Sequence, residues 1–494
     1  MKCTSFVSAL CVVLTITLTS AYAQDNWNGG TGNWTNGSDW SAGLPAAGSD
    51  VVIYSGGSDT VTLDTSPTIN SLTLGGASNG FPSELTGKGP LAQTLTITNG
   101  LTVGQTGFLD PGITVTAGTL TNNGTIGDRS TELGPSLIVD GAFVNNGTVN
   151  FSNVTAGSLV NGNTLDGVSI TAGSLVNFGS ILDADNRGSI QINGNANNSG
   201  TIEISFASSG GLAQFTNITG TLTNSGNFNL YSNGASMGSL VNSGSVGLDG
   251  KGPVFPATLQ VNGDATNSGQ ISGFGSTIIN ITGTLTNSGT FEGNTVTIGG
   301  MLTNEATGQI NLLVTGGVLQ ALGGLSNNGV INVNNGSSID PPFVNNGGII
   351  NIDSASKMIV GTGTPSGLGY IQLANGTLGE IINSHNSFGV ININGSALLD
   401  GTLNVLLQGG FNPRVGSIFQ FLFANPGQIG GAFGNIQNDC FDNDTECWLV
   451  TYDRADGIVE LTAEQAPVPE PATLLVLIPG LLVAGYGLRR RLLQ

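Results

Sequence analysis

One short phrase recurs along most of the chain and limits how it can fold. It joins an apolar residue, a small residue and Asn to a Gly-containing step and a second apolar run, as in LTNNGTI from Leu120, LTNSGTFEG from Leu285 and LSNNGVINV from Leu325. Its copies lie mostly about 20 to 25 residues apart, an interval typical of stacked repeats. Apolar residues alternate with Thr, Ser or Asn, so one face of each short strand is buried. Each copy therefore predicts a strand, a turn and a second strand.

The Asn-x-Gly step supplies residue types that accept left-handed backbone angles, and it predicts a sharp turn between the two strands. A single unit buries its apolar face poorly, whereas stacked units share a continuous core. A propeller blade needs about 40 residues and four strands, so the shorter interval favours a solenoid. We therefore predict an all-β, right-handed parallel β-helix over residues 71–394, with ladders of Asn side chains inside or at the turns.

The two ends of the body differ from the repeats. Residues 24–70 carry Trp27, Trp34 and Trp40 in Gly- and Asn-rich turns, and large indoles suit a lid over the first coil. A platform on which sugars stack is the alternative interpretation of these rings. Residues 395–464 alternate as strands around a Gly-Gly turn and predict a small antiparallel cap that stops edge-to-edge growth.

Composition excludes several classes of protein. Hydrophobic residues reach 38%, so the chain can bury a core and is not a highly charged disordered polymer. The formal net charge is −20 with only 11 Lys and Arg, whereas nucleic-acid binding needs clustered basic residues. No nucleic-acid partner is expected.

Residues 1–23 have the layout of a secretory signal peptide: one Lys, an apolar stretch from Phe6 to Leu18, and a small-x-small site at its end. Cleavage is expected between Ala23 and Gln24, which predicts export of the chain. A membrane anchor that is never cut is the alternative.

Residues 465–494 end the chain with a short linker, a Pro-Glu-Pro step, an apolar run and three arginines. The uncharged run from Ala472 to Leu488 is just long enough to cross a bilayer as a helix. The arginines that follow it favour the cytoplasmic side, which places the body outside. The run is therefore predicted to be a transmembrane helix.

The order of these parts resembles the PEP-CTERM sorting signal of Gram-negative bacteria. The resemblance covers about 25 residues. It implies recognition by an exosortase-type transpeptidase, an inner-membrane stage before processing, and release to the cell surface or extracellular matrix. The residues that carry it are Pro469, Glu470, Pro471, Arg489, Arg490 and Arg491. An anchor that stays unprocessed is the alternative.

Two cysteines remain in the exported body, Cys440 and Cys447, and they are predicted to form one disulfide. A zinc site would need two more ligands. Asp442, Asp444 and Glu446 alternate within this loop and are weak candidates for Ca²⁺ binding, but the loop lacks the usual turn Gly and the twelfth-position Glu, so solvated acids are the favoured interpretation.

Residues with the chemistry for catalysis are few. Asp183, Asp185 and Arg187 alternate in ILDADNRGSI, a pattern that carboxylates paired with a nearby Arg explain better than a catalytic site. The single histidine, His385, has no partner that the repeat identifies and is interpreted as a turn residue. We expect no cofactor, no resident metal and no enzymatic activity.

The architecture resembles the β-helical passenger regions of bacterial autotransporters and surface adhesins, with little motif specificity for function. These features predict a non-catalytic, exported structural or adhesive protein of the cell surface or exopolysaccharide matrix, whose partner is a polysaccharide or surface glycan. A β-helical polysaccharide lyase or hydrolase, and a tail-anchored periplasmic scaffold, are the alternatives.

Overall fold

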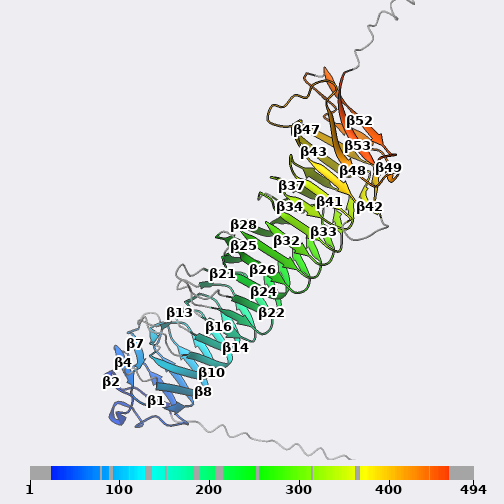
Figure 1. Ribbon diagram of the computed structural model, residues 1–494. Helices are drawn as coiled ribbons and strands as arrows, with labels where there is room; N and C mark the ends of the chain where they lie inside the picture. The colour runs from blue at the N-terminus through cyan, green and yellow to red at the C-terminus, as the bar shows by residue number, and fades with distance from the viewer. Residues whose placement is uncertain are drawn as a thin grey trace, which may run out of the picture. The chain divides into compact units, whose positions relative to one another are not determined.

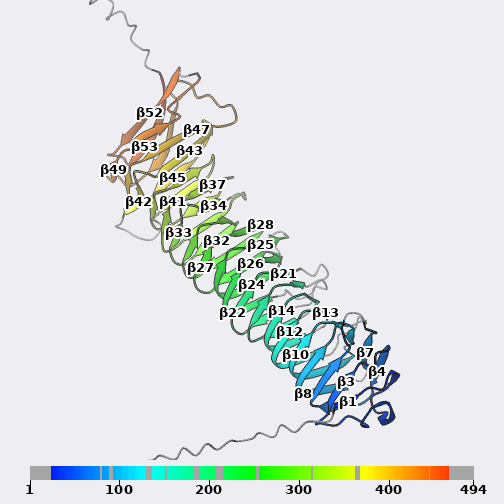
Figure 2. The same ribbon diagram turned by 180° about the vertical axis from the view of Figure 1, so that it is seen from behind.

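Short strands repeat along the described chain, and the only other regular element among the described residues is one turn of 3-10 helix, Gly37–Asp39 (Figures 1 and 2). The computed structural model describes residues 24–77, 80–87, 93–110, 112–127, 136–150, 153–167, 169–182, 189–205, 215–251, 255–312, 315–361, 368–443 and 445–466. The chain divides into two units, residues 1–220 and 221–494, and each is described by itself. The boundary falls inside β22 (Phe215–Asn224).

In the first unit, successive coils add strands to two parallel sheets. The first sheet contains β1 (Gln24–Asn26), β3 (Asp50–Ile53), β5 (Thr68–Ile69), β6 (Ser71–Leu74), β8 (Gln93–Val103), β10 (Ile113–Asn122), β12 (Ser136–Asn145), β14 (Asn153–Asn161), β16 (Ser169–Ala172), β17 (Leu175–Asn177), β19 (Ile190–Ile192) and β20 (Ala196–Asn198). The second contains β2 (Gly30–Asn33), β4 (Asp59–Leu63), β7 (Ser83–Gly87), β9 (Gly107–Leu109), β11 (Thr125–Gly127), β13 (Thr148–Asn150), β15 (Thr164–Asp166), β18 (Ser180–Leu182) and β21 (Thr201–Ile204). Each strand pairs in parallel with its counterpart one coil later, as Ile181 does with Ile202.

The second unit repeats this arrangement. Its first sheet contains β24 (Gly234–Asn242), β26 (Ala257–Val261), β27 (Ala265–Asn267), β29 (Thr277–Ile281), β30 (Leu285–Asn287), β32 (Thr295–Ile298), β33 (Leu302–Asn304), β35 (Val318–Ala321), β36 (Leu325–Asn327), β38 (Ser338–Asp340), β39 (Val344–Asn346), β41 (Lys357–Val360), β42 (Leu368–Gln372), β45 (Val390–Ile393), β46 (Ser396–Leu399), β48 (Ile418–Phe423) and β49 (Ile429–Gly431). Its second sheet contains β23 (Asn227–Tyr231), β25 (Ser245–Gly250), β28 (Gln270–Gly275), β31 (Thr290–Glu292), β34 (Gln309–Leu312), β37 (Val330–Val333), β40 (Ile349–Ile352), β43 (Thr377–Ser384), β44 (Ser387–Phe388), β47 (Thr402–Leu407) and β50 (Asn435–Gln437).

These sheets confirm the prediction of an all-β, solenoid-like parallel fold. Parallel pairing extends beyond residues 71–394 at both ends, because Gln24 already pairs with Asp50 and Thr402 still pairs with Asn435. No helix long and apolar enough to span a membrane occurs among the described residues. The segment 472–488, for which a transmembrane helix is predicted, lies outside them.

The core consists of files of aliphatic side chains that point inward at the same position of successive coils. Leu285, Leu302 and Leu325 form one such file: they are in register, and all three are buried. Burying a leucine side chain stabilises a fold by about 1.5–3 kcal/mol. A neighbouring coil provides much of that burial, so the units gain stability by stacking.

A ladder of buried Asn side chains runs beside these files. Within each unit, the Nδ2 of one Asn donates to the Oδ1 of the Asn one coil later, over 2.7 to 3.0 Å. Its members in the first unit are Asn122, Asn145, Asn161, Asn177 and Asn198, and in the second unit Asn224, Asn242, Asn267, Asn287, Asn304, Asn327 and Asn346. The predicted Asn ladder is therefore confirmed, and it lies inside.

The ladder amides also donate to backbone carbonyl oxygens of the turns and strands beside them. The Nδ2 of Asn267, for example, donates to the carbonyl oxygen of Thr290 in the next coil over 2.9 Å, and to that of Gly269 in its own turn over 3.4 Å. A buried amide without hydrogen-bond partners destabilises a fold by about 1–3 kcal/mol. The ladder avoids this cost only while the coils stay in register, so it also fixes their relative position.

The ladder of the second unit ends where a tyrosine and a glutamine replace the usual residues. Gln372 occupies the register position after Asn346, and its Nε2 donates to the carbonyl oxygen of Thr402 over 2.8 Å. The Tyr370 hydroxyl is hydrogen-bonded to the Asn346 side chain and donates to Gln372 Oε1 over 2.8 Å. Burial raises the pKa of Tyr370 far above its usual range, so the phenol stays neutral.

The glycines of the Asn-x-Gly turns do not have the conformation that the sequence suggested. Gly147, Gly200, Gly269 and Gly289 are absent from the residues with positive φ, so left-handed backbone angles do not explain them. Instead, a Cβ on Gly269 would meet the carbonyl oxygen of Gly244 in the preceding coil, closer than real Cβ atoms approach. Glycine is required here because the turns of adjacent coils stack backbone on backbone.

The N-terminal coils bury the three tryptophans of residues 24–70. The rings of Trp27 and Trp34 each lie 4.9 Å from that of Trp40 in edge-to-face contact, and all three residues are buried. The Trp40 Nε1 donates to the carbonyl oxygen of Trp34 over 2.9 Å. Buried rings offer no open face to a sugar, so the alternative of a stacking platform does not hold.

The C-terminal strands change to antiparallel pairing. β53 (Ile458–Gln465) pairs antiparallel with β48 and with β52 (Glu446–Asp453), which also pairs with β51 (Cys440–Phe441). Phe419 is buried there, with the rings of Phe388, Phe411 and Trp448 packed edge-to-face around it at 5.6 to 6.2 Å.

The ladder predicts the cost of removing one amide. We expect Asn267→Ala to lower the free energy of unfolding by about 2 to 4 kcal/mol, because it leaves two buried neighbours, Asn242 and Asn287, each one bond short. Asn262→Ala removes an exposed Asn of the same coil and should cost less than about 0.5 kcal/mol. Urea unfolding followed by circular dichroism measures both, and equal losses would contradict the role of the ladder.

A second prediction separates close backbone approach from backbone conformation. Gly269→Ala should lower the unfolding midpoint more than Gly316→Ala, although only Gly316 has a positive φ, +73°. The reason is that a Cβ on Gly316 would meet no atom within 4 Å. The reverse order of midpoints in thermal unfolding would show that left-handed angles matter more.

Candidate functional site

The outward face of the first sheet in the second unit repeats one kind of side chain. From coil to coil the outward residue of the Asn-containing strand is small and mostly hydroxylated, and register places these residues directly opposite one another. They are Val241, Thr266, Thr286, Thr303 and Ser326. Neighbouring strands lie about 4.8 Å apart, so this file presents similar groups at a constant spacing.

A second outward file accompanies it on the same sheet. It is richer in amides and consists of Ser236, Gln260, Asn280, Thr297, Gln320 and Asp340. The two files are called the polar face below. Its side chains donate and accept hydrogen bonds but carry one charge, so the face suits uncharged polar polymers better than ions.

The second sheet carries a partly exposed amide ladder. The Nδ2 of Asn332 donates to Asn311 Oδ1, and the Nδ2 of Asn351 donates to Asn332 Oδ1, both over 2.8 Å. Asn311 in turn donates to Glu292 Oε1 over 3.1 Å. Donation runs toward the N-terminus here, opposite to the buried ladder, and ends on a carboxylate.

The carboxylates on the described strands do not share a column between adjacent coils. Hydrolysis uses two carboxyl groups that flank one glycosidic bond. In the strand registers of the described residues no Asp or Glu lies opposite another; Asp249, for example, lies between Tyr231 and Phe274. The nearest approach to a shared column is Asp166 and Glu203, with Leu182 in the coil between them.

Of the residues considered for catalysis from the sequence, the structure describes only His385. Asp183, Asp185 and Arg187 lie outside the described residues. His385 is exposed in the turn between β43 and β44, and its ring lies 5.5 Å from that of Phe419 in edge-to-face contact. This position agrees with its interpretation as a turn residue.

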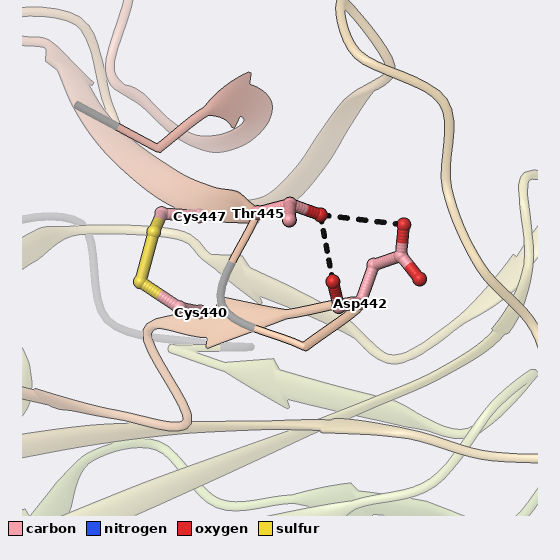
Figure 3. The surroundings of a disulfide bond; sticks show 4 residues. All are labelled: Cys440, Asp442, Thr445 and Cys447. Atoms are coloured by element: carbon pink, nitrogen blue, oxygen red, sulfur yellow. Dashed lines mark hydrogen bonds between the residues drawn. A yellow bond between two sulfur atoms is a disulfide. The ribbon is translucent and has the colours of Figure 1, made fainter. Parts of the chain in front are cut away.

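The cysteine loop is a β-hairpin closed by a disulfide. Cys440 and Cys447 pair across β51 and β52 and are bonded to each other (Figure 3). Asp442 and Asn443 form the turn with φ of 51° and 57°. The Thr445 hydroxyl donates to the Asp442 carbonyl oxygen over 2.6 Å and lies 3.4 Å from its carboxylate (Figure 3).

The structure describes only two of the three acids that are candidates for Ca²⁺ binding in this loop, Asp442 and Glu446. No group of three His, Cys, Asp or Glu side chains among the described residues could hold a metal ion. Asp444 lies outside the described residues. Glu446 lies on β52, where one carboxylate oxygen is buried without a hydrogen-bond partner.

The residues of the two targeting segments are almost entirely outside the described part. Pro469, Glu470, Pro471, Arg489, Arg490 and Arg491 lie outside it, as does Ala23. Gln24, expected as the first residue after cleavage, begins β1. The sorting and cleavage assignments therefore remain predictions from the sequence.

One carboxyl group that the sequence did not single out lies in the core. Glu380 is fully buried on β43, in register between Ile352 and Val405. Burial raises its pKa well above the usual 4.5, the Gly389 backbone N–H lowers it in part, and neither oxygen has a well-formed hydrogen bond. A group sealed from solvent cannot touch a polymer, so its effect is on stability.

A shallow groove lies beyond the polar face, near the C-terminal end of the second unit. Its volume is about 450 Å³, and Ile371, Leu373, Leu398 and Asp400 contribute to its lining. The sequence contained a signal for it that was missed: the outward Thr or Ser of the repeated phrase becomes Ile371 and then Leu398. The groove is apolar with one carboxylate, and it has no arrangement of groups for acid–base catalysis.

Comparison with known proteins does not identify a function for this chain. No family model matches the chain, and no curated protein matches it in sequence.

The buried carboxyl group predicts a pH dependence of stability. A folded-state pKa above the unfolded value means that the stability present below about pH 4.5 is lost as the pH rises toward the folded pKa. Glu380→Gln should therefore have a higher unfolding midpoint than the parent at pH 7, and the difference should vanish toward pH 4. Glu305→Gln, at an exposed turn, serves as the control in thermal unfolding scans, and a pH-independent difference for Glu380→Gln would contradict the assignment.

Proposed function

We propose that this protein is an exported, non-catalytic structural or adhesive component of the cell surface or extracellular polysaccharide matrix. The observation that supports this most directly is the polar face, in which Thr266, Thr286 and Thr303 occupy the same outward position of successive coils. A regular row of uncharged donors and acceptors suits an extended polymer with hydroxyl groups. The partner is an exopolysaccharide or surface glycan.

Affinity would come from repetition. A hydroxyl or amide in contact with solvent gains little from any single hydrogen bond to a ligand, about 0.5–1.5 kcal/mol at most. When one polymer contacts several coils, each further contact is intramolecular, and avidity exceeds the single-site affinity by about 10²–10⁴. The net charge of −20 disfavours strongly anionic polymers.

The targeting segments give the proposed route. Export would use the signal peptide of residues 1–23, and the transmembrane helix expected in residues 472–488 would hold the chain in the inner membrane of a Gram-negative bacterium. An exosortase-type transpeptidase would then recognise Pro469, Glu470 and Pro471. Right-handed winding of the coils and capping of the first coil by the indoles of residues 24–70 belong to the same proposal.

The two alternative functions differ from this proposal in what they require of the chain. A β-helical lyase or hydrolase would need carboxylates or bases gathered at one place, and the described registers give no such column. A tail-anchored periplasmic scaffold would have the same body but would keep its last residues.

The sorting proposal predicts where the protein is found and how it ends. In the native cell the mature chain should lack Arg489 and be recovered with the extracellular polysaccharide. Replacing Pro469, Glu470 and Pro471 by Ala should leave an intact C-terminus and keep nearly all of the protein in the membrane fraction. Pro467→Ala, just outside the motif, should behave as the parent does. Fractionation followed by mass spectrometry of the intact protein measures both quantities.

Two outcomes would contradict the proposal in different ways. A parent chain that keeps Arg489–Arg491 and stays in the membrane supports the scaffold. Release of reducing sugar, or of unsaturated uronate, when the purified protein is mixed with the producer's polysaccharide supports the enzyme.

A further inference from the structure

Three strands of the second sheet in the second unit carry an outward position that the strands of the next four coils are too short to reach, β31, β34, β37 and β40. β23, β25 and β28 extend far enough to present Tyr231, Asp249 and Phe274 at this position, and register places the three in one column. An acidic side chain thus lies between two aromatic ones on consecutive coils. The spacing from Tyr231 to Phe274 is two strand spacings, about 10 Å.

One of the two aromatic side chains of this column is unusually open to solvent. Phe274 is 61% exposed, whereas Tyr231 is half-buried. Most outward positions on these sheets are Thr, Ser, Asn or Gln, and aromatic residues make up only 6% of the chain. An exposed phenyl ring leaves its hydrophobic surface in water without a gain from packing. A ligand that covers it would recover that free energy.

The backbone around the column is fixed by hydrogen bonds. Ser232 has a left-handed φ of 53°, and its N–H donates to the Asp249 carbonyl oxygen over 2.7 Å. The Lys251 N–H donates to the Ser232 hydroxyl over 2.9 Å. Next to Phe274, the Nδ2 of Asn294 donates to the Gly275 carbonyl oxygen over 3.3 Å. The column therefore stands on ordered strands, which lowers the entropy cost of binding.

We propose that Tyr231, Asp249 and Phe274 form a binding subsite for a neutral, extended β-1,4-linked glycan. Aromatic faces stack on the apolar C–H face of a pyranose ring, and a carboxylate accepts hydrogen bonds from sugar hydroxyls. Successive sugars in such a chain repeat at a distance close to the strand spacing, so the two rings are placed to stack on alternate sugars while Asp249 faces the sugar between them.

A neutral glycan fits the charges better than a uronate does. Asp249 lies inside the column, and the chain as a whole carries a net charge of −20. Lys251, two residues further on, offsets one charge only. This subsite rests on the proposed function, because it assumes a glycan partner. It depends, however, on three side chains that lie outside the polar face.

Calorimetric titration of the full-length protein with cellohexaose tests the subsite. Phe274→Ala should weaken binding about tenfold, and Asp249→Asn should weaken it severalfold, whereas Phe274→Trp should retain it. Phe178→Ala is the matched control, because Phe178 is similarly exposed at 63% but belongs to the first unit and is not a member of the column. Its affinity should equal that of the parent. An oligogalacturonate hexamer should bind at least tenfold more weakly than cellohexaose.

The outcomes separate the subsite from the general proposal. Equal affinities for Phe274→Ala, Phe178→Ala and the parent would overturn the subsite, and so would tighter binding of the oligogalacturonate. Absence of cellohexaose binding by the parent would overturn it too. If the protein is still recovered with the extracellular polysaccharide in those cases, the proposed function stands without this subsite. Loss of that recovery from the parent would remove both.

Discussion

Adjacent coils in each unit lie one strand spacing apart, about 4.8 Å, and buried side-chain amides must close their hydrogen bonds across that distance. The Asn ladder does this at a single position of the coil. Asn267, for example, accepts from Asn242 and donates to Asn287 and to the turn of the next coil. A slip in register would leave several buried amides without partners at once, so the ladder fixes the pairing along the unit.

The same spacing determines which residues the turns accept. Backbones of successive Asn-x-Gly turns approach so closely that a Cβ on Gly200 would meet the carbonyl oxygen of Gly179. Where the ladder of the second unit ends, Tyr370 and Gln372 take over its hydrogen bonds before the antiparallel C-terminal strands begin. Stacking also creates the outward files, because whatever one coil presents, the next presents beside it. The proposed multivalent contact with a polymer is thus a consequence of how the core is built.

Much of the fold could be predicted because its information is local and repeated. The alternation around LTNSG fixes which face of a strand is buried, and its recurrence implies that coils stack in parallel. Ladders of Asn followed from the same argument. The role of the glycines was misjudged, because a sharp turn and a close approach between coils both demand glycine, and only the coordinates show that φ stays negative at Gly269. The pairing of Cys440 with Cys447 was predicted correctly from their isolation in a chain that is expected to be exported.

The sequence by itself determined the periodic core and the change of pairing at the C-terminal strands, since each depends on neighbours along the chain. Only the tertiary structure decided which side chains share a column across coils. Tyr231 and Phe274 are 43 residues apart in the sequence, yet they lie in one column with Asp249 between them. From the sequence, Glu380 would be expected to point outward as polar strand residues usually do, but it is buried between two aliphatic neighbours. Coil lengths vary, so alignment between coils cannot be counted from the sequence and has to be read from the strand register.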